Sequence, residues 1–83
     1  MTAEIKLLGN LKREDGAGKI SITTPIKLKQ VIDHLNSRYN AGLRRDGVLI
    51  LVNGVEANAL EDLDTVINEK DEVVFVPMFH GGT

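Results

Sequence analysis

The chain has 83 residues, which suffice for one domain with a modest hydrophobic core. Ten basic and twelve acidic residues give a net charge of only -2, which argues against general nucleic-acid binding. The absence of cysteine excludes disulfides, thiol nucleophiles and zinc–thiolate sites. No apolar run approaches the roughly 18 residues of a membrane span, and the first residues lack a signal-peptide pattern. We therefore expect a cytoplasmic protein with no membrane contact.

Two segments near the N-terminus alternate apolar and polar residues, which predicts two strands. Residues 3–8 place Ala3, Ile5 and Leu7 on one face, and residues 19–23 do the same with two isoleucines. The segment between them is rich in glycine, as turns and loops are. We expect a hairpin with a long connection.

One amphipathic helix is predicted next. Apolar residues recur at helical spacing from Leu28 to Tyr39, with polar residues between them. Its start has two alternatives. Either Thr24 caps the helix and Pro25 occupies the first helical position, or the helix begins near Leu28.

The C-terminal half contains three further segments with strand character: residues 48–52, 55–57 and 71–76. Asn53-Gly54 predicts a tight turn after the first of them. Residues 59–67 are expected to form a loop with one helical turn. Pro77 ends the last strand because proline has no amide hydrogen to donate. The order strand, strand, helix, strand, short strand, strand predicts an α+β fold with one helix on one face of a sheet.

Both faces of two predicted strands are apolar, although one helix can cover only one face. We expect the helix to cover Val48, Ile50, Val52, Val73 and Phe75. The outward side chains are then Leu49, Leu51, Val74 and Val76. These are either the ordinary content of central strands or an exposed patch that marks a partner site. We favour the patch, which Leu8 would join.

The C-terminus ends in Gly81-Gly82-Thr83. A diglycine segment has no side chains, so it can thread a narrow channel to another protein's nucleotide site. A glycine carboxylate is also uncrowded, so it can become an acyl-adenylate that a thiol, an amine or a sulfide then attacks. The sequence suggests no nucleophile–base pair of its own. We therefore expect a protein that is not an enzyme and that binds no metal or cofactor.

Three segments carry a resemblance to a known family: LVNGVE at residues 51–56, DEVVFVP at residues 71–77, and His80-Gly81-Gly82. With them the whole chain resembles the ubiquitin-like β-grasp superfamily, and within it the MoaD/ThiS sulfur carriers, the ubiquitin-related modifiers and the small archaeal modifier proteins. The resemblance implies a ββαββ mixed sheet whose first and last strands pair in parallel. It also implies a domain at residues 1–77 and a flexible tail at residues 78–83.

The resemblance implies a protein modifier, such as an archaeal ubiquitin-like protein made as a pro-form. A protease would remove Thr83, and an activating enzyme would use ATP to adenylate Gly82. Conjugating and ligase proteins would then join Gly82 to target lysines. The alternative is a sulfur carrier with a C-terminal thiocarboxylate for molybdopterin synthesis or tRNA thiolation. A plain interaction domain with an inert tail also stays open, as does Thr83 being a remnant of cloning.

The resemblance further implies which residues meet partners, in a protein expected to be a monomer. The predicted partner-binding residues are Leu8, Leu51, Val74, Val76, Met78, Phe79 and His80. His80 is either a spacer or a group that tunes docking near neutral pH. Arg44-Arg45 is either a solvated charge pair or a contact for an acidic partner surface.

Overall fold

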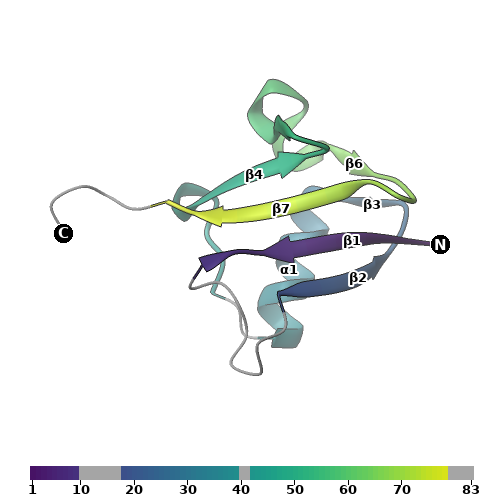
Figure 1. The fold of residues 1–83 in the computed structure, drawn as a ribbon, viewed down its shortest axis with the longest axis horizontal. Helices are drawn as coiled ribbons and strands as arrows, with labels where there is room; N and C mark the ends of the chain where they lie inside the picture. The colour runs from purple at the N-terminus through teal and green to yellow at the C-terminus, as the bar shows by residue number, and fades with distance from the viewer. Residues whose placement is uncertain (10–17, 40–41, 79–83) are drawn as a thin grey trace, which may run out of the picture.

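The computed structural model shows a mixed β-sheet with the helix α1 against one of its faces (Figure 1). The structure describes residues 1–9, 18–39 and 42–78. Its elements are β1 (Thr2–Leu7), β2 (Lys19–Thr23), β3 (Ile26–Lys27), α1 (Leu28–Tyr39), β4 (Val48–Val52), β5 (Val55–Glu56), β6 (Val66–Ile67) and β7 (Glu72–Pro77). The described residues also form the short 3-10 turns η2 (Arg45–Gly47), η3 (Ala57–Ala59) and η4 (Asp62–Asp64). The predicted α+β class is confirmed.

The main sheet has five strands in the order β2-β1-β7-β4-β5. The first and last strands, β1 and β7, pair in parallel, and the other neighbours are antiparallel. This confirms the parallel pairing that the resemblance implies. β7 therefore lies in the middle of the sheet between β1 and β4, as Figure 1 shows.

The core lies between the sheet and α1. Alternate side chains of β1, β2, β4 and β7 face the helix, because side chains alternate across a strand. Among them Ile5 and Phe75 are fully buried. The apolar stripe of α1 meets them with Leu28, Val31 and Leu35, which are also fully buried. The predicted division of β4 and β7 into covered and outward residues is confirmed, since the outward residues are half-buried.

A second, two-stranded sheet was not predicted. β3 pairs with β6 immediately before the helix, and the Leu28 amide donates to the Thr65 carbonyl over 2.9 Å. The helix consequently begins at Leu28, and the alternative start at Thr24 and Pro25 is wrong. The predicted loop at residues 59–67 contains η4 and β6. Strands of two residues are too short to show the alternation that identifies a strand.

Candidate functional site

β7 carries the chain from the centre of the sheet towards the C-terminal tail. Met78 follows it with an exposed side chain, and its amide donates to the Gly47 carbonyl over 3.1 Å. The predicted tail residues outside the described part of the chain are Phe79, His80, Gly81, Gly82 and Thr83. Their roles stay predictions. Pro77 and Met78, the last described residues, are here called the tail root.

The outer face of the sheet carries an apolar patch beside the tail root. This sheet-face patch consists of Leu8, Leu49, Leu51, Val74 and Val76. Leu49 lies opposite Val76 and Leu51 opposite Val74 in neighbouring strands. Leu8 lies beside β7, because its amide donates to the Phe75 carbonyl over 3.1 Å. The structure thus brings together the four predicted sheet positions, of which Leu8 is the most exposed at 41%.

A charged pair borders the sheet-face patch on the side away from the tail root. Lys6 lies opposite Val74, and its Nζ is 2.9 Å from the Glu72 carboxylate. The hydrogen bond to Glu72 and the charge of that carboxylate raise the pKa of Lys6 above its usual value. The outer sheet face thus carries apolar side chains beside the tail root and a charged pair further along β1 and β7.

The tail root packs closely against Gly9. Gly9 has a φ of +58, a region that favours glycine. A Cβ added there would lie 3.0 Å from Cγ of Pro77, which is closer than ordinary contact. Sequence reasoning placed Gly9 in a turn and missed this contact. Its only signal was a glycine directly after an apolar strand.

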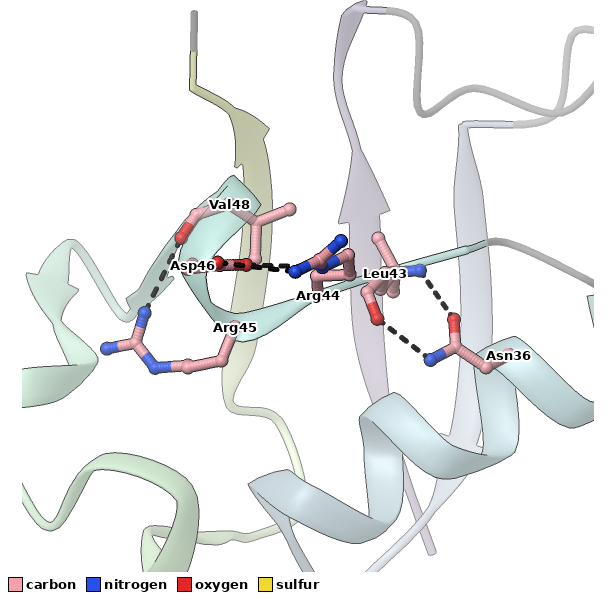
Figure 2. Close-up of polar contacts among 6 residues, drawn as sticks. All are labelled: Asn36, Leu43, Arg44, Arg45, Asp46 and Val48. Atoms are coloured by element: carbon pink, nitrogen blue, oxygen red, sulfur yellow. Dashed lines mark hydrogen bonds and ion pairs between the residues drawn. The ribbon is translucent and has the colours of Figure 1, made fainter. Parts of the chain in front are cut away.

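Arg45 anchors the turn that holds the tail root. Its Nε and Nη2 lie 2.9 and 2.7 Å from the same carboxylate oxygen of Asp62 in η4. Nη1 also donates to the Val48 carbonyl over 3.5 Å, as Figure 2 shows. Arg44 by contrast has a side chain that is 78% exposed, and among the described residues it pairs only with nearby Asp46. The reading as a solvated charge pair therefore fits Arg44, while Arg45 joins two segments.

Asn36 connects the helix to the same turn. Its Nδ2 donates to the Leu43 carbonyl over 2.9 Å, and its Oδ1 accepts from the Leu43 amide over 2.6 Å (Figure 2). The Asn36 side chain thus satisfies both the N–H and the C=O of Leu43, a buried residue. η2, which supplies the Gly47 carbonyl to Met78, is held from α1 on one side and from η4 on the other. Sequence reasoning gave no indication of this role.

The described residues contain neither a metal centre nor a membrane span. No group of three or more His, Cys, Asp or Glu side chains lies close enough to hold a metal ion within residues 1–9, 18–39 and 42–78. No helix in this part of the chain is long and apolar enough to cross a bilayer. What the geometry offers is a flat apolar surface beside an anchored strand end, which suits docking to another protein.

Comparison with known proteins identifies the family. Residues 5–82 match the ThiS family. "Ubiquitin-related modifier 1 homolog" of Drosophila simulans is 32% identical over 84 residues, which cover 92% of this chain and 82% of that protein. "Ubiquitin-related modifier 1 homolog 1" of Arabidopsis thaliana is 53% identical over only 38 residues, or 46% of this chain and 38% of the plant protein. The chain thus matches less than half the length of that relative.

Solved structures agree with this assignment. The small archaeal modifier protein 1 of Methanosarcina acetivorans has a TM-score of 0.79 and 25% identity, covering 98% of this chain and 96% of that one. One chain from the complex of subunits 1 and 2 of the molybdopterin-converting factor of Helicobacter pylori has a TM-score of 0.69 and 20% identity, covering 99% of this chain and 100% of that one. The second likeness shows the fold alone. The chain therefore belongs to the ThiS family, within the ubiquitin-like β-grasp superfamily.

Proposed function

We propose that the protein is a ubiquitin-like modifier made as a pro-form. Removal of Thr83 exposes the Gly82 carboxylate. An activating enzyme then joins this carboxylate to AMP from ATP, with release of pyrophosphate, and a target lysine amine finally displaces AMP. The protein itself binds no cofactor, acts as a monomer in the cytoplasm, and relies on a protease and on conjugating and ligase proteins for the other steps.

One observation carries this proposal: the strand that leads to Gly81-Gly82 is the central strand of the sheet and ends beside the sheet-face patch. Its end is fixed by the Met78–Gly47 hydrogen bond and by the contact with Gly9. A partner that covers the patch would therefore meet the tail root at a defined position. The relation to ubiquitin-related modifiers supports the same chemistry.

The test uses the protein ending at Gly82, the protein ending at Thr83, and a protein lacking residues 81–83. Each is incubated with ATP and an activating enzyme of ubiquitin-related modifiers, and products are separated after thiol treatment. We expect thiol-resistant adducts, in which the Gly82 carboxyl is joined to a target lysine by an isopeptide bond, from the Gly82 form alone. Absence of any adduct from that form would refute the proposal.

Membership of the ThiS family favours a second candidate function, a sulfur carrier. In it the same acyl-adenylate is attacked by a sulfide equivalent, so that a terminal thiocarboxylate forms and AMP leaves. Intact mass of the activated Gly82 form distinguishes the two functions, because the carrier gains sulfur in place of oxygen. A product that never contains sulfur argues against the carrier.

A further inference from the structure

The two edges of the main sheet differ in how they are protected. At one edge, β5 pairs with β4, and the Arg45 guanidinium donates to the Val48 carbonyl beyond the end of β5. At the other edge, no described residue pairs with the outer side of β2. β2 is five residues long, so it offers a regular row of backbone groups. Such an open edge is a template for another strand.

The hydrogen-bond pattern shows which backbone groups are free. The Leu7 amide donates to the Gly18 carbonyl over 2.7 Å, and the Thr24 amide donates to the Met1 carbonyl over 2.9 Å. In an antiparallel pair, residues facing the partner alternate with residues facing away. Ile20 and Ile22 therefore bond to β1. The residues that direct both N–H and C=O to the open edge are Lys19, Ser21 and Thr23.

The charges on this strand indicate what the edge binds. Lys19 lies opposite Lys6, and two like charges directly opposite each other across strands are unfavourable. Glu72 neutralises Lys6 from the side of β7. Lys19 is exposed and has no carboxylate partner among the described residues. A carboxylate on a strand added beside β2 would provide the missing partner.

The position of α1 favours a single extended segment over a second copy of this chain as the partner at the β2 edge. In Figure 1 the C-terminal end of α1 extends past β2. If two copies paired through their β2 edges about a two-fold axis normal to the sheet, their helices would meet on the same face. A lone strand brings no helix. Its inward side chains would instead lie beside the helix-facing residues Ile20 and Ile22 of β2, which are buried, and this favours apolar residues at alternate positions.

We propose that the open edge of β2 binds an extended segment of another protein, in which apolar and acidic residues alternate, as an added strand. The backbone of Lys19, Ser21 and Thr23 supplies the hydrogen bonds, and the Lys19 ammonium selects acidic side chains. This surface is distinct from the sheet-face patch. Binding at this edge does not depend on the fate of Gly82. Two partners can therefore bind at once, one at the β2 edge and one at the sheet-face patch.

Amide hydrogen exchange tests the geometry in the free protein. Ile20 and Ile22 should be protected, while the amides of Lys19, Ser21 and Thr23 should exchange at least about tenfold faster. Equal protection of all five amides would overturn the proposal, because the edge would already be paired. Protection of the three outward amides that rises with protein concentration would also overturn it, in favour of a second copy of the chain.

Peptide binding tests the occupant. The probes are a short blocked peptide of alternating valine and glutamate and its valine–lysine counterpart, titrated into isotopically labelled protein. The glutamate peptide should bind about tenfold more tightly and should slow exchange at the three outward amides. Lys19→Glu should reverse this preference, whereas Lys27→Glu, at an exposed lysine outside β2, should not. Equal affinity for both peptides, or no binding of either, would overturn the proposal.

A backbone variant separates strand addition from simple charge attraction. Ser21→Pro removes an N–H that points away from β1 and has no partner among the described residues, and edge strands tolerate proline. We expect this variant to fold, with Ile20 and Ile22 still protected, and to lose the peptide, while Ser21→Ala keeps it. Undiminished binding by a folded Ser21→Pro protein would contradict strand addition. If proline prevents folding, the charge reversal at Lys19 still decides.

Discussion

At the residue scale, adjacent arginines have different roles because their surroundings differ. Arg45 makes two contacts to one Asp62 oxygen and a third to Val48, and its side chain is 35% exposed. Arg44 pairs with Asp46, two residues away in the chain. A pair that joins segments distant in sequence restricts the fold, whereas a local exposed pair contributes little. Arg45 therefore stabilises η2, and through it the tail root.

We predict that Arg45→Ala loosens the tail root while Arg44→Ala does not. The first change should lower the free energy of unfolding by about 1 kcal/mol, because it removes hydrogen bonds to a charged group. The second should change it by less than about 0.5 kcal/mol. Urea denaturation measures both. In addition, the Met78 amide should exchange faster in Arg45→Ala only, and equal exchange in the two variants would show that Arg45 does not act on the tail root.

Gly9→Ala should also disturb the tail root, through its contact with Pro77. The new Cβ would press on Pro77, and alanine is unfavourable at this positive φ. We expect a loss of about 1 kcal/mol or more in unfolding free energy, together with shifted amide resonances of Pro77's neighbours Val76 and Met78. Gly54→Ala is the matched control. It has a φ of +84 but an open Cβ position, so it should lose stability without moving those resonances.

At the element scale, β7 combines two tasks. Its inward residues Val73 and Phe75 are fully buried in the core, while its outward residues form the centre of the sheet-face patch. The strand thus connects the core directly to the tail root, which includes its last residue, Pro77. A change on its outer side should affect docking with little effect on folding.

We predict that Val76→Glu weakens activation of the Gly82 form by at least about tenfold, equivalent to about 1.4 kcal/mol of binding. A carboxylate in the middle of an apolar contact loses water without gaining a partner. The matched control is Val66→Glu, on β6, where the valine is exposed outside the patch. Initial rates of adenylate formation measure the effect. Equal rates for the two variants would show that the patch does not dock the activating enzyme.

Elements with a long apolar pattern were predictable from the sequence, and the two-residue strand β5 was predicted through the Asn53-Gly54 turn signal before it. β4 matches the predicted residues 48–52, and the helix stripe from Leu28 to Tyr39 is correct. The outward positions of Leu51 and Val74 follow from alternation alone. β3 and β6 escaped notice because two residues show no period. The roles of Asn36 and Arg45 depend on residues seven and seventeen positions away, which no local pattern reveals.

At the scale of the whole molecule, the sheet, the helix and the tail root all depend on one small hydrophobic core. The fully buried side chains of the sheet and helix form a single cluster, in which Phe75 is the largest. Small domains have a net stability of only about 5–15 kcal/mol. The tail root therefore depends on the same few contacts that hold the fold together.

We predict that Phe75→Ala costs about 3–5 kcal/mol, because it leaves a cavity between β7 and α1. A large share of the domain's total stability would be lost, so the midpoint of urea denaturation should fall steeply. Phe75→Leu, which keeps most of the volume, should cost much less. If the two variants had the same midpoint, Phe75 would not be the centre of the core.

The most direct test of the whole account is the intact mass of the mature protein purified from its own cells. The account predicts a chain that has lost Thr83 and ends at Gly82, either free, joined to a lysine, or carrying sulfur. A mature population that retains Thr83 throughout would contradict it, because the carboxylate that other enzymes must activate would never be exposed.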